Sequence, residues 1–295
     1  MEHFIVIAAA VFGAALGSFA NVAIYRLPRE GLSISKPRLS FCPRCKETIA
    51  WYDNIPLLSY VFLLGRCRHC KAEISARYPL VEAICAFLFG LSAYHFALSG
   101  QWTVFVISCA FCLALVIITF IDIDFRIIPD VIDKPGIAVV PLLSFAAPGL
   151  HLGDFMQLLG WLGVKWQSSQ PFSWSDRGLA VASSLFGILI GAGLTYIVGV
   201  AGKFVFKKEA MGFGDVKLMG MMGGILGWQG VIFAFFVGSL IGAVVGVSLV
   251  TFARRRDSHI AFGPFLAAGG ILVLFYEAQI KHFILVTYPQ WLAGM

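Results

Sequence analysis

Charged side chains are scarce in this chain of 295 residues, where Asp, Glu, Lys and Arg together make up 13%. Soluble globular proteins carry about a quarter, so the composition excludes an ordinary soluble domain. Hydrophobic residues make up 59% and occur in long runs. Because every backbone group in lipid needs an internal hydrogen-bond partner, these runs predict an all-α polytopic membrane protein.

The hydrophobic runs number eight, and a helix needs roughly 20 such residues to cross the hydrocarbon core. Six are clear: 4–24, 79–97, 103–121, 178–202, 230–253 and 260–276. Two weaker runs, 131–150 and 213–228, carry charged residues near one end. The first run lacks the basic start and cleavage site of a signal peptide. We therefore expect about eight transmembrane helices, the first of them retained.

Basic residues are unevenly distributed between the loops on the two sides of the expected bundle. With eight spans, nearly all of the Lys and Arg fall on one side, mainly in 26–77 and near 203–208 and 254–256. The positive-inside rule places this side in the cytoplasm and both termini outside. Basic loops facing lipid headgroups account for the net charge of +6, so no nucleic-acid partner is expected.

One sizeable polar segment, 26–78, separates the first two hydrophobic runs. It contains four prolines and little helical periodicity, which favours a small loop-rich domain that needs a staple. The expected organisation is a first transmembrane helix at 1–25, a cytoplasmic domain at 26–78 and a transmembrane bundle at 79–295. A tryptophan-containing connection, 151–176, is expected to lie on the external membrane surface. The sequence shows no obvious internal repeat.

The cysteines point to a metal site. Four of the seven form two pairs, Cys42 with Cys45 and Cys67 with Cys70, each enclosing two residues. Two such pairs complete a tetrahedral Zn²⁺ site of the structural kind. Reduced metal-free thiols and two disulfides are the alternatives, and disulfides are rare in the cytoplasm. A further pair with this spacing, at 109 and 112, lies inside an apolar run and is interpreted as core packing.

Acidic residues at the ends of apolar runs are the candidate catalytic groups. Asp122 ends the run 103–121, and Asp215 follows Gly212 and Gly214 near the start of another. A carboxylate at the edge of a bilayer is costly and indicates a function or a partner. Paired carboxylates that share a proton carry out aspartyl proteolysis.

Alternatives remain for each of these acids. Asp124 competes with Asp122, while Asp130 precedes an apolar run and suits a helix cap. Asp215 could instead pair with Lys217. Glu82, inside the second run, is interpreted as an ion-pair partner, with a ligand-binding role open.

The ordered motifs resemble the type IV prepilin peptidase family over nearly the whole chain. A Gly-x-Gly-Asp motif alone is weak, because other intramembrane aspartyl proteases share it, but the ordered set is specific. The resemblance rests on Gly17-Ser-Phe-Ala-Asn21, Tyr25-Arg-Leu-Pro28, the two cysteine pairs, Asn54-Ile-Pro-Leu57, Arg77-Tyr-Pro-Leu-Val-Glu82, Asp122 to Ile128-Pro-Asp130, Gly212-Phe-Gly-Asp215-Val-Lys217 and Phe262-Gly-Pro264.

This resemblance implies a bifunctional enzyme of the bacterial inner membrane with Asp122 and Asp215 as its catalytic pair. It would cleave the basic leader of type IV prepilins and type II secretion pseudopilins after glycine, on the cytoplasmic side. It would then methylate the new N-terminal amine with S-adenosylmethionine. The sequence holds no glycine-rich methyltransferase loop, so our hypothesis for the cofactor site is Asn54, Arg77 and Glu82.

The competing interpretation is a zinc-knuckle membrane transporter that uses its acids for ion or proton coupling. Transporters of this kind place such acids at mid-bilayer, often between inverted repeats. Here the key acids lie at the ends of runs, which favours the peptidase. A purely structural scaffold has no use for two matched acids.

Overall fold

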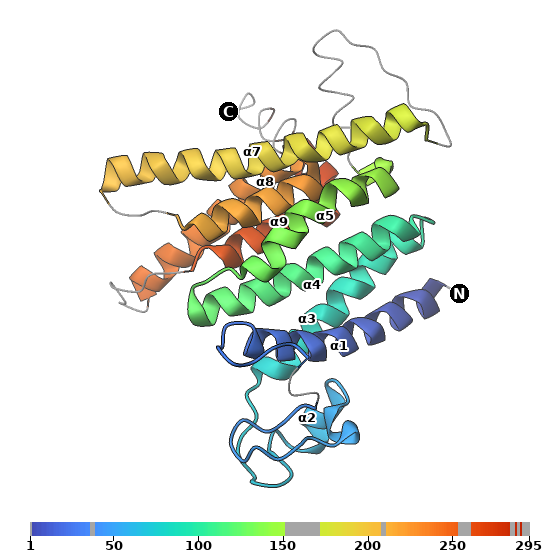
Figure 1. Cartoon of the computed structure of the whole chain (residues 1–295), viewed down its shortest axis with the longest axis vertical. Helices are drawn as coiled ribbons and strands as arrows, with labels where there is room; N and C mark the ends of the chain where they lie inside the picture. Colours follow the sequence, from blue (N-terminus) through green and yellow to red (C-terminus); the bar gives the residue numbers. More distant parts are fainter. Residues whose placement is uncertain are drawn as a thin grey trace. The chain divides into compact units, whose positions relative to one another are not determined.

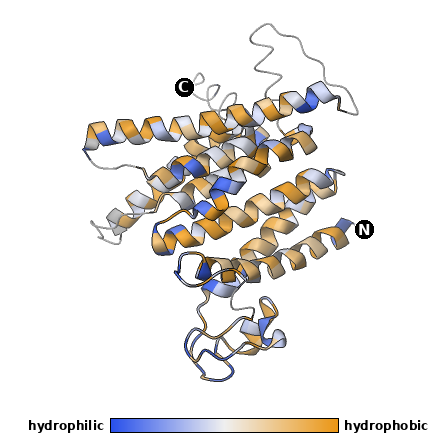
Figure 2. Cartoon of the chain, viewed as in Figure 1, coloured by the Kyte–Doolittle hydropathy of each residue, from blue (hydrophilic) through white to orange (hydrophobic). Residues whose placement is uncertain are grey.

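The computed structural model describes residues 2–35, 39–150, 172–207, 211–252, 261–283, 287 and 290. These residues form helices and loops, with isolated β-bridges but no β-strand among them (Figure 1). The chain divides into two compact units, Met1–Phe125 and Arg126–Met295. Figure 2 shows that hydrophobic residues cover the long helices, while hydrophilic residues gather at helix ends and in loops.

The first unit packs three long helices and carries the small polar domain. Helices α1 (Glu2–Arg26), α3 (Arg77–Ser92) and α4 (Trp102–Phe125) are the long ones, and α3 continues into the π-helical turn η2 (Ala93–Ala97). A Cβ at Gly17 would lie 2.8 Å from the Glu82 Cα, so glycine brings α1 and α3 into backbone contact. Between them, the polar domain contains η1 (Trp51–Asn54) and α2 (Leu58–Phe62).

The second unit contains the remaining helices. Its described elements are α5 (Asp130–Ala146), η3 (Pro148–Leu150), α7 (Trp174–Phe206), α8 (Phe213–Phe252) and α9 (Gly263–His282). Helix α7 begins with a capping box in which the Ser173 hydroxyl accepts from the Asp176 amide at 3.2 Å and the Asp176 carboxylate accepts from the Ser173 amide at 2.9 Å. These reciprocal bonds satisfy amides that a helix start leaves unpaired.

Helix α8 folds back on itself at Gly227, whose backbone is non-helical at φ 75° and ψ 177°. A Cβ at Gly191 of α7 would lie 2.2 Å from the Met219 carbonyl oxygen and 2.9 Å from the Val231 Cγ2. Twelve residues of straight helix would separate Met219 from Val231 by about 18 Å. The chain therefore reverses between them, and the two arms of α8 both pack on α7.

All eight expected spans correspond to helices. Among the described residues, six helices are long and apolar enough to cross a membrane, with α8 counted once. The two weaker runs correspond to α5 and to the first arm of α8. The helical membrane fold is thus confirmed. Most of the connection 151–176 lies outside the described residues, and Trp174 at its described end is exposed.

Contact between α7 and α8 leaves no room for a side chain at Gly187. A Cβ there would lie 2.1 Å from the Gly223 carbonyl oxygen, whereas a Cβ at Gly193 would meet no described atom within 4 Å. We expect Gly187→Ala to lower the stability of the protein by about 1–3 kcal/mol. Gly193→Ala on the same helix should leave stability unchanged or raise it slightly. Thermal unfolding in detergent measures both, and equal melting temperatures would contradict this packing.

Candidate functional site

Two hairpin turns of the polar domain present the four paired cysteines. In the first, the Cys42 amide donates to the Glu47 carbonyl at 2.9 Å, and the Lys46 amide donates to the Cys42 carbonyl at 2.9 Å. In the second, the corresponding bonds from Cys67 to Ala72 and from Lys71 to Cys67 measure 2.8 and 3.0 Å. The two turns are therefore copies of one zinc-knuckle geometry.

Backbone conformation repeats along with the hydrogen bonds. Lys46 and Lys71, which follow the second cysteine of each pair, have φ of 63° and 59°. The segments 40–49 and 65–74 thus form a short internal repeat that the sequence analysis missed. The signal was present, since each segment reads Cys-x-x-Cys-Lys and ends in isoleucine.

The four thiols converge on one point. Their sulfur atoms all lie within 4.8 Å of one another, and the Cys42 and Cys70 sulfurs are 3.9 Å apart. Four sulfurs about 2.3 Å from a tetrahedral zinc would be about 3.8 Å apart, so the cluster fits this ion. Although partial burial opposes it, hydrogen bonds from the Cys45 and Arg44 amides lower the pKa of the Cys42 thiol to about 7. The Glu47 amide lowers the pKa of the Cys45 thiol, but burial and the neighbouring thiols outweigh it and raise this pKa to about 11. Cys42 is therefore the thiol that forms the thiolate more readily, which is the form that a metal binds.

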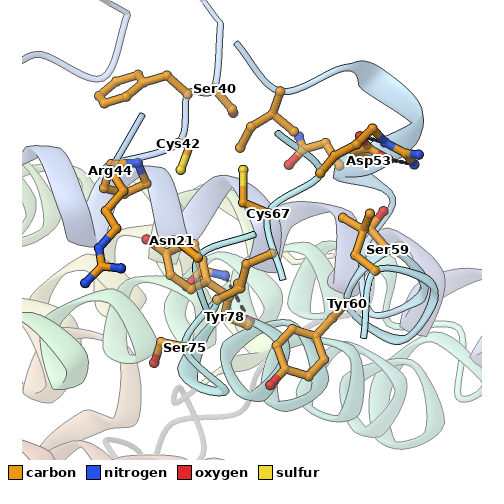
Figure 3. A pocket seen from close by; sticks show the side chains of 18 of the residues that line it. Asn21, Ser40, Cys42, Arg44, Asp53, Ser59, Tyr60, Cys67, Ser75 and Tyr78 are labelled. Carbon is orange, nitrogen blue, oxygen red and sulfur yellow. Dashed lines mark hydrogen bonds and ion pairs between the residues drawn. The ribbon is translucent and has the colours of Figure 1, made fainter. Parts of the chain in front are cut away.

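A cavity of about 780 Å³ lies beside the knuckles, within the first unit. Its walls come from the end of α1, both knuckles, the η1–α2 segment and the start of α3. Figure 3 shows Cys42 and Cys67 on one wall, and the Asn21 amide donating to the Tyr78 carbonyl at 3.0 Å across the base. The volume is that of a typical small-molecule site.

The three residues proposed for the cofactor are placed differently. Asn54 and Glu82 line the cavity, and Arg77 is outside its lining. The Arg77 guanidinium instead forms an ion pair with Asp124 and donates to the Phe120 carbonyl at 3.2 Å. Arg77 and Asp124 therefore join the start of α3 to the end of α4.

Glu82 holds a strained turn in place. Its Oε2 accepts a 2.7 Å hydrogen bond from the Leu57 amide. Leu57 has φ 62° and ψ −49°, and the Leu58 amide donates to the Pro56 carbonyl at 2.6 Å. This is a tight γ-turn that non-glycine residues seldom adopt. The buried carboxyl of Glu82 thus fastens the η1–α2 segment to a membrane helix.

Each candidate catalytic aspartate is nearly buried at a helix end within its own unit. Asp122 lies in the last turn of α4 and is 6% exposed. Asp215 lies in the first turn of α8, is 8% exposed, and its Oδ2 accepts from the Gly212 amide at 3.1 Å. Burial of this degree suits carboxyls that exchange protons.

A network of charges surrounds the start of α5 in the second unit. Lys217 pairs with Asp130, and Lys134 approaches the same carboxylate at 2.7 Å. Asp130 is the first residue of α5, and the N-cap position carries no side-chain cap. Asp130 therefore forms ion pairs and is not the helix cap that its place in the sequence suggested. A Cβ at Gly214 would lie 3.0 Å from the Ile128 Cβ, so this glycine is needed for packing within the unit.

Asp133 is a buried acid whose burial the sequence analysis missed. It is fully buried, and neither carboxyl oxygen has a hydrogen-bond partner among the described residues. Asp130, Asp215 and Lys217 are close enough to act on it electrostatically. Val140 and Ser144 are the other buried residues of α5, and only the packed helices show that this face is buried. A carboxyl in such surroundings is costly.

Comparison with known proteins covers most of the chain. Residues 11–96 match the bacterial peptidase A24 N-terminal domain, and residues 109–247 match the type IV leader peptidase family. A prepilin leader peptidase/N-methyltransferase of Stutzerimonas stutzeri is 33% identical across 93% of this chain and 92% of its own length. The protein with this name from Pseudomonas aeruginosa is 33% identical across 95% and 92%.

A further relative carries a different name. The type 4 prepilin-like proteins leader peptide-processing enzyme of Escherichia coli is 33% identical across 92% of this chain and 93% of its own length. No solved structure matches the chain.

The sulfur cluster predicts one zinc ion per chain. Cys42→Ser should lose the metal and open the polar domain to proteolysis, because a small loop-rich domain folds around its metal. Cys109→Ser, in the buried pair on α4, is the matched control and should keep the metal. Elemental analysis of reduced, purified protein measures both. Zinc loss from Cys109→Ser, or no zinc in the parent protein, would contradict this assignment.

Proposed function

Since the chain belongs to the type IV leader peptidase family, we propose that it is a prepilin leader peptidase and N-methyltransferase of the bacterial inner membrane. It removes the basic leader of type IV prepilins and type II secretion pseudopilins, and then methylates the new N-terminal amine. The observation that carries this proposal is the pair of nearly buried aspartates, each at a helix end within a matched family region. The names of the relatives favour it over ion transport.

We assign the hydrolysis to Asp122 and Asp215. One carboxylate takes a proton from the attacking water, while the protonated partner donates a hydrogen bond to the scissile carbonyl oxygen. The proton then passes to the leaving amine, and the two ionisations belong to the pair as a whole. We expect this chemistry on the cytoplasmic side, because the positive-inside rule favours that side for the basic loops and a prepilin leader remains there while its apolar segment lies in the bilayer.

We assign methyl transfer to the cavity beside the knuckles. S-adenosylmethionine would supply an electrophilic methyl group there, and Asn54 and Glu82, which line the cavity, would bind its polar groups. Arg77 is not part of this assignment because its guanidinium pairs with Asp124. Zinc held by Cys42, Cys45, Cys67 and Cys70 would be structural, because four protein ligands leave no open position.

Loss of either catalytic carboxylate should stop cleavage. Asp122→Asn and Asp215→Asn keep side-chain volume but remove the shared proton, so we expect no leader removal from a prepilin in either variant. Asp124→Asn is the control, because it removes an exposed ion pair worth at most about 1 kcal/mol, and it should still cleave. Intact mass of the substrate reports the result. Full cleavage by Asp215→Asn would remove that residue from the pair.

The two activities should separate when mature pilin is the substrate. Asn54→Ala should reduce methyl transfer to a free pilin N-terminus by about tenfold, the effect of losing about 1.4 kcal/mol of positioning, and should leave prepilin cleavage intact. Asp215→Asn should show the opposite pattern, with methylation of mature pilin retained. A labelled methyl donor measures both. If Asp215→Asn also blocks methyl transfer to mature pilin, the two reactions share one site.

A further inference from the structure

The polar domain exposes an apolar surface that its own fold leaves uncovered. Six large apolar side chains of η1, α2 and the adjoining loops, none of them in the lining of the cavity, are 50% to 84% exposed. We call this surface the apolar face, and it consists of Trp51, Tyr52, Leu58, Val61, Phe62 and Leu64. Contiguous apolar surface of this kind marks contact with another molecule or with a membrane.

The η1–α2 segment has one side toward the cavity and one side exposed, and hydrogen bonds and an ion pair hold it in one orientation. Ser59, Tyr60 and Leu63 line the cavity, so the α2 side chains between them point elsewhere. The Ser59 hydroxyl donates to the Tyr52 carbonyl at 3.2 Å, which ties α2 to η1. Arg68 pairs with Asp53 at 2.5 Å, which ties η1 to the second knuckle. The apolar face is thus a fixed surface of the domain.

The hydrogen bond between Leu57 and Glu82 places the η1–α2 segment at the level of the membrane. Leu57 bonds to Glu82, which lies five residues inside the membrane-spanning helix that begins at Arg77. Five helical residues rise about 7.5 Å. Arg77 and Asp124 form a charged pair that belongs with the headgroups, because charges avoid the hydrocarbon. The chain at Leu57 therefore lies deeper along α3 than this charged pair.

We propose that the apolar face is inserted in the cytoplasmic interface of the bilayer, with lipid as its partner. The start of α3 also exposes an apolar side chain, because Leu80 is 52% exposed in this membrane-spanning helix. Trp51 and Tyr52 are of the types that concentrate at membrane interfaces. The exposed Arg66 follows the apolar run and suits anionic headgroups. A short helix with these features lies in the plane of the interface.

Such insertion would hold the cavity at the membrane surface. Because Ser59 and Tyr60 line the cavity from the same helix, lipid contact on one side of α2 fixes the wall on the other. A pilin whose apolar segment remains in the bilayer would then present its new N-terminus at the height of the cavity. This consequence rests on the proposed function, whereas the lipid contact does not.

The contact can be tested in the full-length enzyme without any substrate. p-Benzoylphenylalanine replaces Phe62, which is 80% exposed, in vesicles of phosphatidylethanolamine and phosphatidylglycerol. The matched control carries the same group at Glu47, an exposed acid of the first knuckle. After illumination, intact mass should show lipid adducts at position 62 about fivefold or more above those at 47, as expected for an interfacial helix. Zinc content confirms that both variants are folded.

The other possible partners give different masses. A crosslinked dimer of the chain in these vesicles, or an adduct with pilin and none with lipid when pilin is added, would overturn the proposal. Equal lipid labelling at 62 and 47 would also overturn it. Brominated lipid provides a second measurement. The fluorescence of Trp51 is the difference between the parent protein and Trp51→Phe, and brominated lipid should quench it. An unquenched Trp51 signal would contradict insertion. Failure of methyl transfer would leave these outcomes unchanged, so the two proposals fail separately.

Discussion

The hydrogen bond between the Leu57 amide and the Glu82 carboxylate is the contact on which the first unit depends. It joins a polar domain to an apolar helix, at a point where an unpaired carboxyl would be costly. It holds the Leu57 turn, and that turn directs α2 so that one side lines the cavity and the other carries the apolar face. Cys42 and Cys67 of the two knuckles line the same cavity. A single buried acid therefore links membrane anchoring to the shape of the cavity.

The second unit depends on close backbone contact between helices. Gly187 and Gly223 bring α7 against the first arm of α8, and Gly191 contacts both arms. Small residues serve this purpose in membranes, where helices gain little from hydrophobic burial and rely on van der Waals packing. This contact supports the start of α8, where Asp215 accepts its amide hydrogen bond. The pair of Lys217 with Asp130 joins the same helix to α5.

The acids near the helix ends have distinct surroundings. Asp124 and Asp130 are exposed enough to form ion pairs with Arg77 and Lys217. Asp122 and Asp215 are nearly buried, which favours the catalytic role that we propose for them. Asp133 is fully buried, and Asp215 is among the charged groups that act on it electrostatically. Burial, more than position in sequence, distinguishes these five acids.

The sequence by itself determined the membrane class, the helix-forming runs, the tetrahedral cysteine set and the acids at helix ends. These features depend on local pattern, since hydropathy over about 20 residues defines a span and ligand spacing defines a knuckle. Tertiary structure decided the partners of the polar residues. Arg77 pairs with Asp124 across 47 positions and Glu82 bonds to Leu57 across 25. Such pairings, like the burial of Asp133 and the reversal of α8, arise where helices meet, which a local pattern does not encode.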